Sequence, residues 1–140
     1  MHLATYCKGE EMKRVIAILI LSIGLISTKK VEAAELHLGK ATAYCLKGKT
    51  ASGIVLDGTP KQIVASKPEW IGKLMMIWVD TGDHIPHYEN FLGYFLIEDT
   101  STKKSIRETG KIIDVYLPTY EECMEFGAPD VIYEVFESEG

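Results

Sequence analysis

After about residue 40, the chain consists mainly of short apolar runs separated by polar turns. The longest uninterrupted run, residues 74–79, carries no charge and has the length of a buried strand rather than a helix. Gly, Asp and Pro bound several of the other runs, which favours strands closed by tight turns. The strands that we expect are residues 41–46, 54–56, 62–65, 74–79, 91–98, 111–117 and 130–136.

Helical signals are few and short. Pro68 and Gly72 delimit one helical turn or bend in residues 67–72. Thr119 is a good N-cap, with Glu122 at the third helical position, and Gly127 ends the short helix that follows. We therefore predict an all-β fold with one short helix, built as a small closed barrel that leaves no long exposed strand edge.

The N-terminal segment has the features of a secretory signal peptide. A basic start at residues 12–14 precedes an uncharged run over residues 15–27, and residues 31–33 resemble a small-residue cleavage site. We predict a signal peptide over residues 1–33, with Met12 as a possible true start, and a single domain over residues 34–140. An uncleaved N-terminal anchor is the alternative.

The net charge and the cysteine content limit which binding partners and which cellular compartment we expect. The formal net charge is −5, and it becomes more negative without residues 1–33, which hold five basic but only three acidic residues. An acidic domain is a poor partner for nucleic acid. We expect a secreted or cell-wall monomer that does not contact the membrane after cleavage. Cys45 and Cys123 would remain, either bridged or as two buried thiols.

Two aspartates are the first candidates for chemistry. Asp99 ends one predicted strand, and Asp114 lies inside the next one between apolar residues. A carboxylate in that setting is costly to bury unless it is paired or faces a cleft. If the strands are neighbours, both carboxyl groups could share a pocket suited to acid/base chemistry on a glycosidic bond. Alternatively, Asp99 caps a turn and Asp114 binds loop amides.

Other residue clusters point to structure rather than to chemistry. Pro86 separates His84 from His87 and no Cys or third His lies near, so we expect a solvated loop and no metal site. Cys45 lies in a predicted strand, which favours a structural role over that of a nucleophile. Neither a phosphate loop nor a dinucleotide fingerprint is present, and we expect no cofactor. The aromatic residues that could stack on sugar or simply fill the core are Trp70, Trp78, Tyr94 and Tyr116.

Four segments, in order along the chain, resemble the 3D domain, a double-psi β-barrel named for three aspartates. They are residues 41–45 with 50–53 (ATAYC and TASG), residues 63–68 (IVASKP), residues 98–100 (EDT), and residues 113–116 (IDVY) followed by Phe126-Gly127. The resemblance covers about residues 40–136. It implies a six-stranded double-psi barrel similar to the catalytic barrel of a membrane-bound lytic transglycosylase.

The resemblance also implies an activity and roles for residues. The family chemistry cleaves the bond between N-acetylmuramic acid and N-acetylglucosamine in peptidoglycan without water and gives a 1,6-anhydro product. Asp114 would be the acid/base and Asp99 the second carboxylate, and Tyr44 and Thr50 would line the glycan groove. The first family aspartate aligns with Lys67, at the groove rim, and the nearby Glu69 could replace it. A non-catalytic glycan-binding barrel that has lost this aspartate is therefore the alternative.

Overall fold

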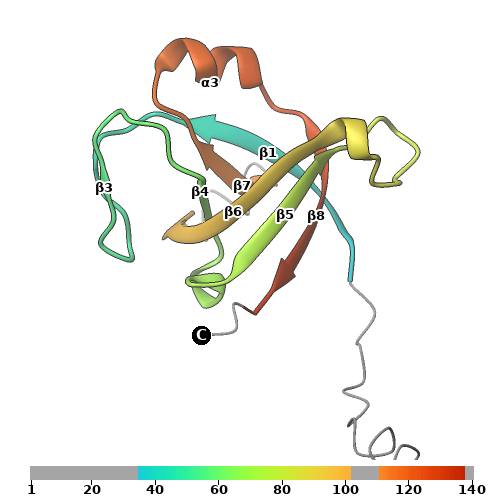
Figure 1. Ribbon diagram of the computed structural model, residues 1–140, viewed down its shortest axis with the longest axis horizontal. Coiled ribbons are helices and arrows are strands. Elements are labelled where there is room, and N and C mark those ends of the chain that lie inside the picture. The colour runs from blue at the N-terminus through green and yellow to red at the C-terminus, as the bar shows by residue number, and fades with distance from the viewer. Residues whose placement is uncertain (1–34, 102–110, 138–140) are drawn as a thin grey trace, which may run out of the picture. The chain divides into compact units, whose positions relative to one another are not determined.

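The computed structural model describes residues 35–101 and 111–137, in which six strands close into a barrel in the order β1–β7–β4–β6–β5–β8 (Figure 1). The barrel strands are β1 (His37–Tyr44), β4 (Ile63–Ser66), β5 (Leu74–Val79), β6 (Phe91–Thr100), β7 (Lys111–Tyr116) and β8 (Asp130–Phe136). The remaining elements are the paired strands β2 (Gly48–Lys49) and β3 (Val55–Leu56), the 3₁₀ turns η1 (Pro68–Trp70) and η2 (Tyr88–Asn90), and the helix α3 (Tyr120–Phe126). The predicted all-β class with one short helix is confirmed.

The barrel mixes parallel and antiparallel pairs. β1 pairs with β7 in parallel and β4 pairs with β6 in parallel, whereas the other four neighbours are antiparallel. Closure gives each of the six strands two hydrogen-bonded neighbours, so none of them presents a free edge along its whole length.

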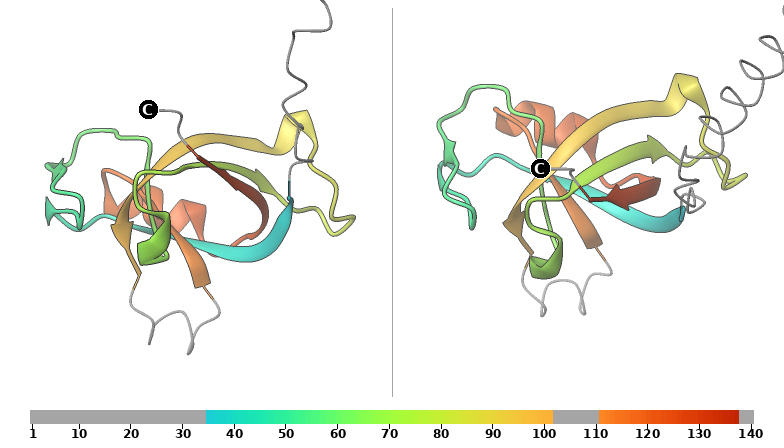
Figure 2. Two further views of the ribbon diagram at one scale, coloured as in Figure 1. Left: turned by 90° about the horizontal axis from the view of Figure 1, so that it is seen from below. Right: turned by 60° about the horizontal axis from the view of Figure 1, so that its bottom comes forward.

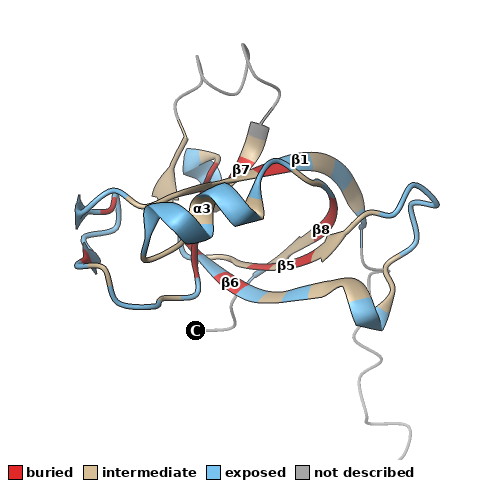
Figure 3. Ribbon diagram, turned by 90° about the horizontal axis from the view of Figure 1, so that it is seen from above, coloured by how far each residue is buried: buried red, intermediate tan, exposed pale blue. Residues whose placement is uncertain are grey.

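Alternation of side chains builds the core inside the barrel. Strand β5, predicted as a core strand, buries Met75 and Ile77 completely and leaves the residues between them less buried. Figure 3 shows buried stretches on several strands around the ring. The interior of a six-stranded barrel is narrow enough for side chains to fill it. The main cluster contains Ala41, Val64, Met75, Ile77, Phe95, Ile97, Ile113, Val115, Val131 and Tyr133.

Two excursions and one helix extend from this frame. The segment that carries β2 and β3 and the loop between β5 and η2 lie on opposite sides of the barrel (Figures 1 and 2). Helix α3 contacts β1, and its N-terminus has the predicted capping box: Thr119 accepts from the Glu122 backbone N–H, and the Glu122 side chain accepts from the Thr119 backbone N–H.

Some sequence expectations differ from the structure at their boundaries. β1 begins at His37 rather than residue 41, and β6 extends to Thr100, so that Asp99 lies within a strand and not after it. The two-residue strand β2 was not expected, because it is too short to carry a periodic pattern. The predicted signal peptide lies outside the described residues and stays a prediction. Within the described residues, no helix has the length and apolarity needed to cross a membrane.

Candidate functional site

The register of four adjacent strands places Thr42, Asp114, Ala65 and Asp99 side by side. Thr42 pairs with Asp114, Ala65 pairs with Asp114, and Ala65 also pairs with Asp99. Directly opposite residues in neighbouring strands project to the same face of a sheet. The positions just before them on β1, β7 and β4 are core residues, so this row faces away from the barrel interior. The two aspartates therefore share the outer face, separated only by strand β4.

Both aspartates line one cavity. Its volume is about 310 Å³, and its wall is formed by Tyr44, Leu46, Ala65, Asp99, Thr100, Ser101 and Asp114. The backbone positions of the two aspartates are two strand spacings apart, or about 10 Å. Between them, Ala65 contributes only a methyl group, which leaves the space between the two carboxyl-bearing strands open.

Asp99 is held in place by three hydrogen-bond donors. Its Oδ1 accepts from the backbone N–H of Ala51 at 3.1 Å and of Thr100 at 2.9 Å. Its Oδ2 accepts from the Tyr44 hydroxyl at 3.2 Å. This network fixes the position of the Asp99 carboxyl group at one wall of the cavity. Asp99 thus accepts from two backbone amides, those of Ala51 and Thr100.

Asp114 has a different setting. Its Oδ1 accepts from the Thr42 hydroxyl at 3.1 Å, across the β1–β7 pair. The pKa of Tyr44 is raised above its ordinary value, chiefly by burial. The next causes are the charge of Asp99 and the hydrogen bond to it, followed by the charges of Asp114 and Tyr116. Tyr44 thus remains a neutral donor between two acidic groups.

The turn at residues 50–53 positions the backbone N–H of Ala51, which donates to Asp99. The backbone N–H of Ser52 donates to the Glu98 carbonyl at 3.1 Å, and that of Gly53 donates to the Thr50 carbonyl at 3.0 Å. Gly53 has φ +96°, a conformation that side-chain-bearing residues rarely adopt. Thr50 is buried, and its hydroxyl accepts from the Ile54 N–H within the same turn. Thr50 therefore stabilises the turn that carries the Ala51 donor, and it does not line the cavity.

Lys67 and Glu69 also lie outside the cavity wall. Lys67 follows β4 and places its Nζ 4.5 Å from the centroid of the Trp70 ring, a cation–π contact. Glu69 is exposed in η1. Trp70 packs against the core, and Tyr116 is buried. Among the sequence candidates, the cavity therefore brings together Tyr44, Asp99 and Asp114.

Sequence reasoning missed Thr42, Ala65, Leu46 and Ser101. Thr42 and Ala65 belong to the segments that carry the family resemblance, but neither residue type signals a site by itself. Their importance comes from strand register, which joins residues far apart in the sequence. A second feature of this face is a small cluster of Leu56, Ile63 and Tyr116, against which Tyr44 packs. The β2–β3 excursion is thereby anchored on the outer face beside the cavity.

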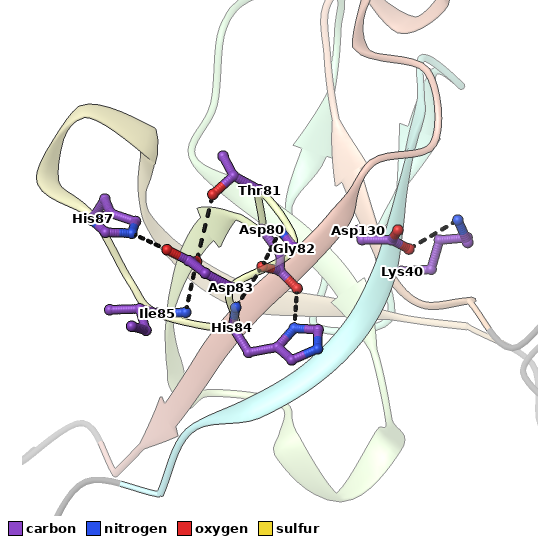
Figure 4. A network of polar contacts seen from close by, with 9 residues as sticks. All are labelled: Lys40, Asp80, Thr81, Gly82, Asp83, His84, Ile85, His87 and Asp130. Carbon is purple, nitrogen blue, oxygen red and sulfur yellow. Dashed lines mark hydrogen bonds and ion pairs between the residues drawn. The ribbon is translucent and has the colours of Figure 1, made fainter.

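The loop between β5 and η2 holds two aspartate–histidine pairs (Figure 4). Asp80 Oδ2 lies 2.6 Å from His84 Nδ1, and Asp83 Oδ2 lies 2.6 Å from His87 Nε2. The hydrogen bond to Asp83 and the charge of that carboxylate raise the pKa of His87. Over the described ranges, no group of three or more His, Cys, Asp or Glu side chains could hold a metal ion. These pairs organise the loop.

A further cavity, of about 380 Å³, lies beside α3 and is lined mainly by apolar side chains such as Leu92, Phe95 and Phe126. Its carboxylate, Glu122, is occupied by the capping box of α3. This cavity therefore lacks the paired acidic groups that the aspartate cavity offers.

Neither a protein-family model nor a curated protein matches this sequence. Function is therefore inferred from the aspartate cavity and its side chains.

Proposed function

We propose that this protein is an exported lytic transglycosylase of the 3D type, which cleaves the N-acetylmuramic acid–N-acetylglucosamine bond of peptidoglycan and forms a 1,6-anhydro product. The observation that carries the proposal is the pair Asp99 and Asp114, which face one cavity across the small side chain of Ala65. Two carboxyl groups in unlike environments, beside an open space, suit acid/base chemistry on a glycosidic bond.

The strand arrangement supports the double-psi type of barrel. The closed ring contains two parallel pairs, β1–β7 and β4–β6, which the antiparallel pair β7–β4 joins. All four segments that resemble the 3D domain contribute residues to the cavity wall, among them Tyr44, Ala65, Asp99 and Asp114. Ala65 separates the two aspartates.

The hydrogen bonds favour a division of roles. Both oxygens of Asp99 accept from donors of the protein, including two backbone amides, which suits a fixed charge rather than a group that repeatedly gains and loses a proton. The acid/base role falls to Asp114, as the resemblance to the 3D domain implies. As the acid it protonates the leaving glycosidic oxygen, and as the carboxylate it accepts the proton of the muramoyl 6-hydroxyl group as that oxygen closes the anhydro ring.

A non-catalytic glycan-binding barrel is the second candidate, and the residue at position 67 favours it. Lys67 stands where the family has its first aspartate, and its ammonium group lies over Trp70 instead of adding a carboxylate. Such a barrel would keep the cavity and bind peptidoglycan without cleaving it.

Digestion of purified peptidoglycan separates the two candidates. The wild-type protein should release anhydromuropeptides, detected by mass spectrometry, and Asp114→Asn should reduce their release at least about 100-fold, as expected for loss of a general acid/base. Asp130→Asn is the matched control, because Asp130 is an exposed carboxylate paired with Lys40 at 3.0 Å. That control should remain active.

The opposite results are equally specific. Anhydromuropeptide release that survives Asp114→Asn unchanged would refute Asp114 as the acid/base. If the wild type and Asp114→Asn are both inert yet sediment with peptidoglycan, the binding barrel replaces the enzyme. Circular dichroism of each variant checks that loss of activity does not reflect loss of the fold.

A further inference from the structure

Two thiols meet at the edge of the aspartate cavity. Cys45 directly follows β1 and lies between Tyr44 and Leu46, which both line the cavity. Cys123 lies on α3. Both are half-buried free thiols, and helix α3, which carries Cys123, packs against β1, which Cys45 follows. Cys45 also lies close enough to Cys123 to raise the pKa of that thiol. The two thiols are therefore neighbours that remain partly accessible from solvent.

The barrel itself brings these residues together. Tyr44 pairs with Tyr116 at the ends of the parallel strands β1 and β7, and the Leu117 N–H donates to the Tyr44 carbonyl at 2.9 Å. The capping box then sets the start of α3 three residues later, and Phe126 packs against the core at its end. Cys123 is thus fixed opposite Cys45 by the same pairing that positions Tyr44.

We propose that Cys45 and Cys123 are a site of disulfide formation, and that the bond clamps α3 to the cavity wall formed by residues 44–46. The oxidant is a disulfide of the glutathione or disulfide-oxidoreductase class. One cysteine thiolate attacks its sulfur, releases one thiol and forms a mixed disulfide. The second cysteine attacks that mixed disulfide, closes the Cys45–Cys123 bond and releases the second thiol, so two protons and two electrons pass to the oxidant.

The setting of the pair affects the rate of this exchange. Burial, followed by the charge and hydrogen bond of Cys45 and the charges of Asp114 and Glu122, raises the pKa of Cys123 to about 11. At neutral pH this thiol is mostly protonated, and only the thiolate attacks a disulfide. Exchange with the disulfide oxidant is therefore slow at neutral pH, and alkaline pH accelerates it.

The disulfide would stabilise the folded domain and restrain the cavity wall at residues 44–46. It closes a loop of about 80 residues, which restricts the unfolded chain strongly. For a domain of this size the melting temperature should rise by roughly 10 °C or more on oxidation. Amide hydrogen exchange should slow in residues 44–46 and in α3, the two segments that the bond joins.

The test uses the full chain with Cys7→Ser, so that only these two cysteines remain. Incubation with oxidised glutathione should reduce the titratable thiols from two to none and yield a Cys45–Cys123 cross-linked peptide in non-reducing mass spectrometry. The rise in melting temperature should disappear with dithiothreitol. Cys45→Ser and Cys123→Ser, each measured with and without oxidant, are matched controls and should show no rise.

Three results would overturn the proposal. They are the absence of a cross-linked peptide under oxidant, stable glutathione adducts on both cysteines instead of a bridge, and an oxidised form whose melting temperature and hydrogen exchange equal those of the reduced form. All of these readouts are independent of peptidoglycan cleavage, so failure here is distinct from failure of the proposed enzyme.

Discussion

At the scale of single residues, Tyr44 connects the two acidic groups of the cavity. Its hydroxyl donates to Asp99, its ring meets Tyr116 edge-on with centroids 5.7 Å apart, and the charge of Asp114 also acts on it. A phenol in this position supplies a hydrogen bond without adding charge. Tyr44 thus sets the orientation of Asp99 and the polarity of the space in front of Asp114.

Tyr44 should therefore resist ionisation. We expect it to titrate well above the ordinary pKa of 10.0, because burial and the neighbouring carboxylates disfavour the phenolate. Since the pKa is raised on folding, the stability that it contributes is present below pH 10 and is lost as the pH rises through the folded value. The difference between the ultraviolet pH titrations of the wild type and of Tyr44→Phe measures the pKa of Tyr44. Asp99→Asn should lower this pKa; an unchanged value would contradict the cause that we assign.

His87 gives a second titration, in a different part of the molecule. Its pKa is raised by the hydrogen bond to Asp83 and by the charge of that carboxylate, so we expect a value above 6.5 by proton NMR. The resulting stability is present below about pH 6.5 and is lost as the pH rises through the raised value. Asp83→Asn should return the pKa of His87 toward 6.5. If the pKa stays raised in that variant, Asp83 is not its cause.

At the scale of elements, strand β4 forms the part of the cavity wall between the two aspartates. It lies between the strands that carry the two aspartates, and its outward residue at that level, Ala65, is the smallest side chain in the cavity wall. The next residue, Ser66, points into the barrel, where its hydroxyl donates to the Ile112 carbonyl at 2.7 Å. Ile112 is skipped by the register between β1 and β7, so Ser66 satisfies a carbonyl at a bulge. One strand thus supports both faces of the barrel.

Enlarging Ala65 should close the cavity. Ala65→Leu adds three carbon atoms to its wall, so we expect peptidoglycan cleavage or binding to fall at least about 10-fold. Although Ala65 is only 5% exposed, the added atoms can extend into the cavity, so the melting temperature should shift by less than about 8 °C. Ala41→Leu is a contrasting variant: Ala41 is completely buried in the core cluster, so its enlargement should destabilise the barrel more. Undiminished glycan processing by Ala65→Leu would show that the substrate does not enter between the aspartates.

At the scale of the whole molecule, local signals and long-range pairing explain different parts of the structure. Residues 74–79 and 130–136 were predicted with the bounds that the structure has, because an apolar run and an alternating run each define a strand locally. The capping residues defined α3 in the same way. Asp99 and Asp114 could be selected because a carboxylate next to apolar strand residues is unusual.

The remaining features depend on contacts between distant segments. The row of Thr42, Asp114, Ala65 and Asp99 exists only once four strands are in register, and two of those pairs contain bulges that no local pattern predicts. The resemblance to the 3D domain implies that Thr50 lines the groove, whereas the structure has its hydroxyl accepting from the Ile54 N–H beside the turn. Lys67 likewise follows β4 at the expected place, but its side chain packs on Trp70.

Closure of the ring also predicts how the protein unfolds. Ile77 on β5 and Ile113 on β7 lie on opposite sides of the six-strand order, and both are completely buried in the same cluster. Removing either side chain leaves a cavity in one shared core, so Ile77→Ala and Ile113→Ala should each cost about 2–5 kcal/mol.

Because no barrel strand can leave without breaking two ladders, both variants should unfold in one transition at a lower temperature. Far-ultraviolet circular dichroism and tryptophan fluorescence should give coincident curves for each variant. Exposed Leu38→Ala, on β1, is the control and should change the melting temperature little. Separate transitions for the two signals, or a loss of stability in only one of the two variants, would mean that the two halves of the barrel are stabilised independently. In that case the shared core would not be what holds Asp99 and Asp114 at one cavity.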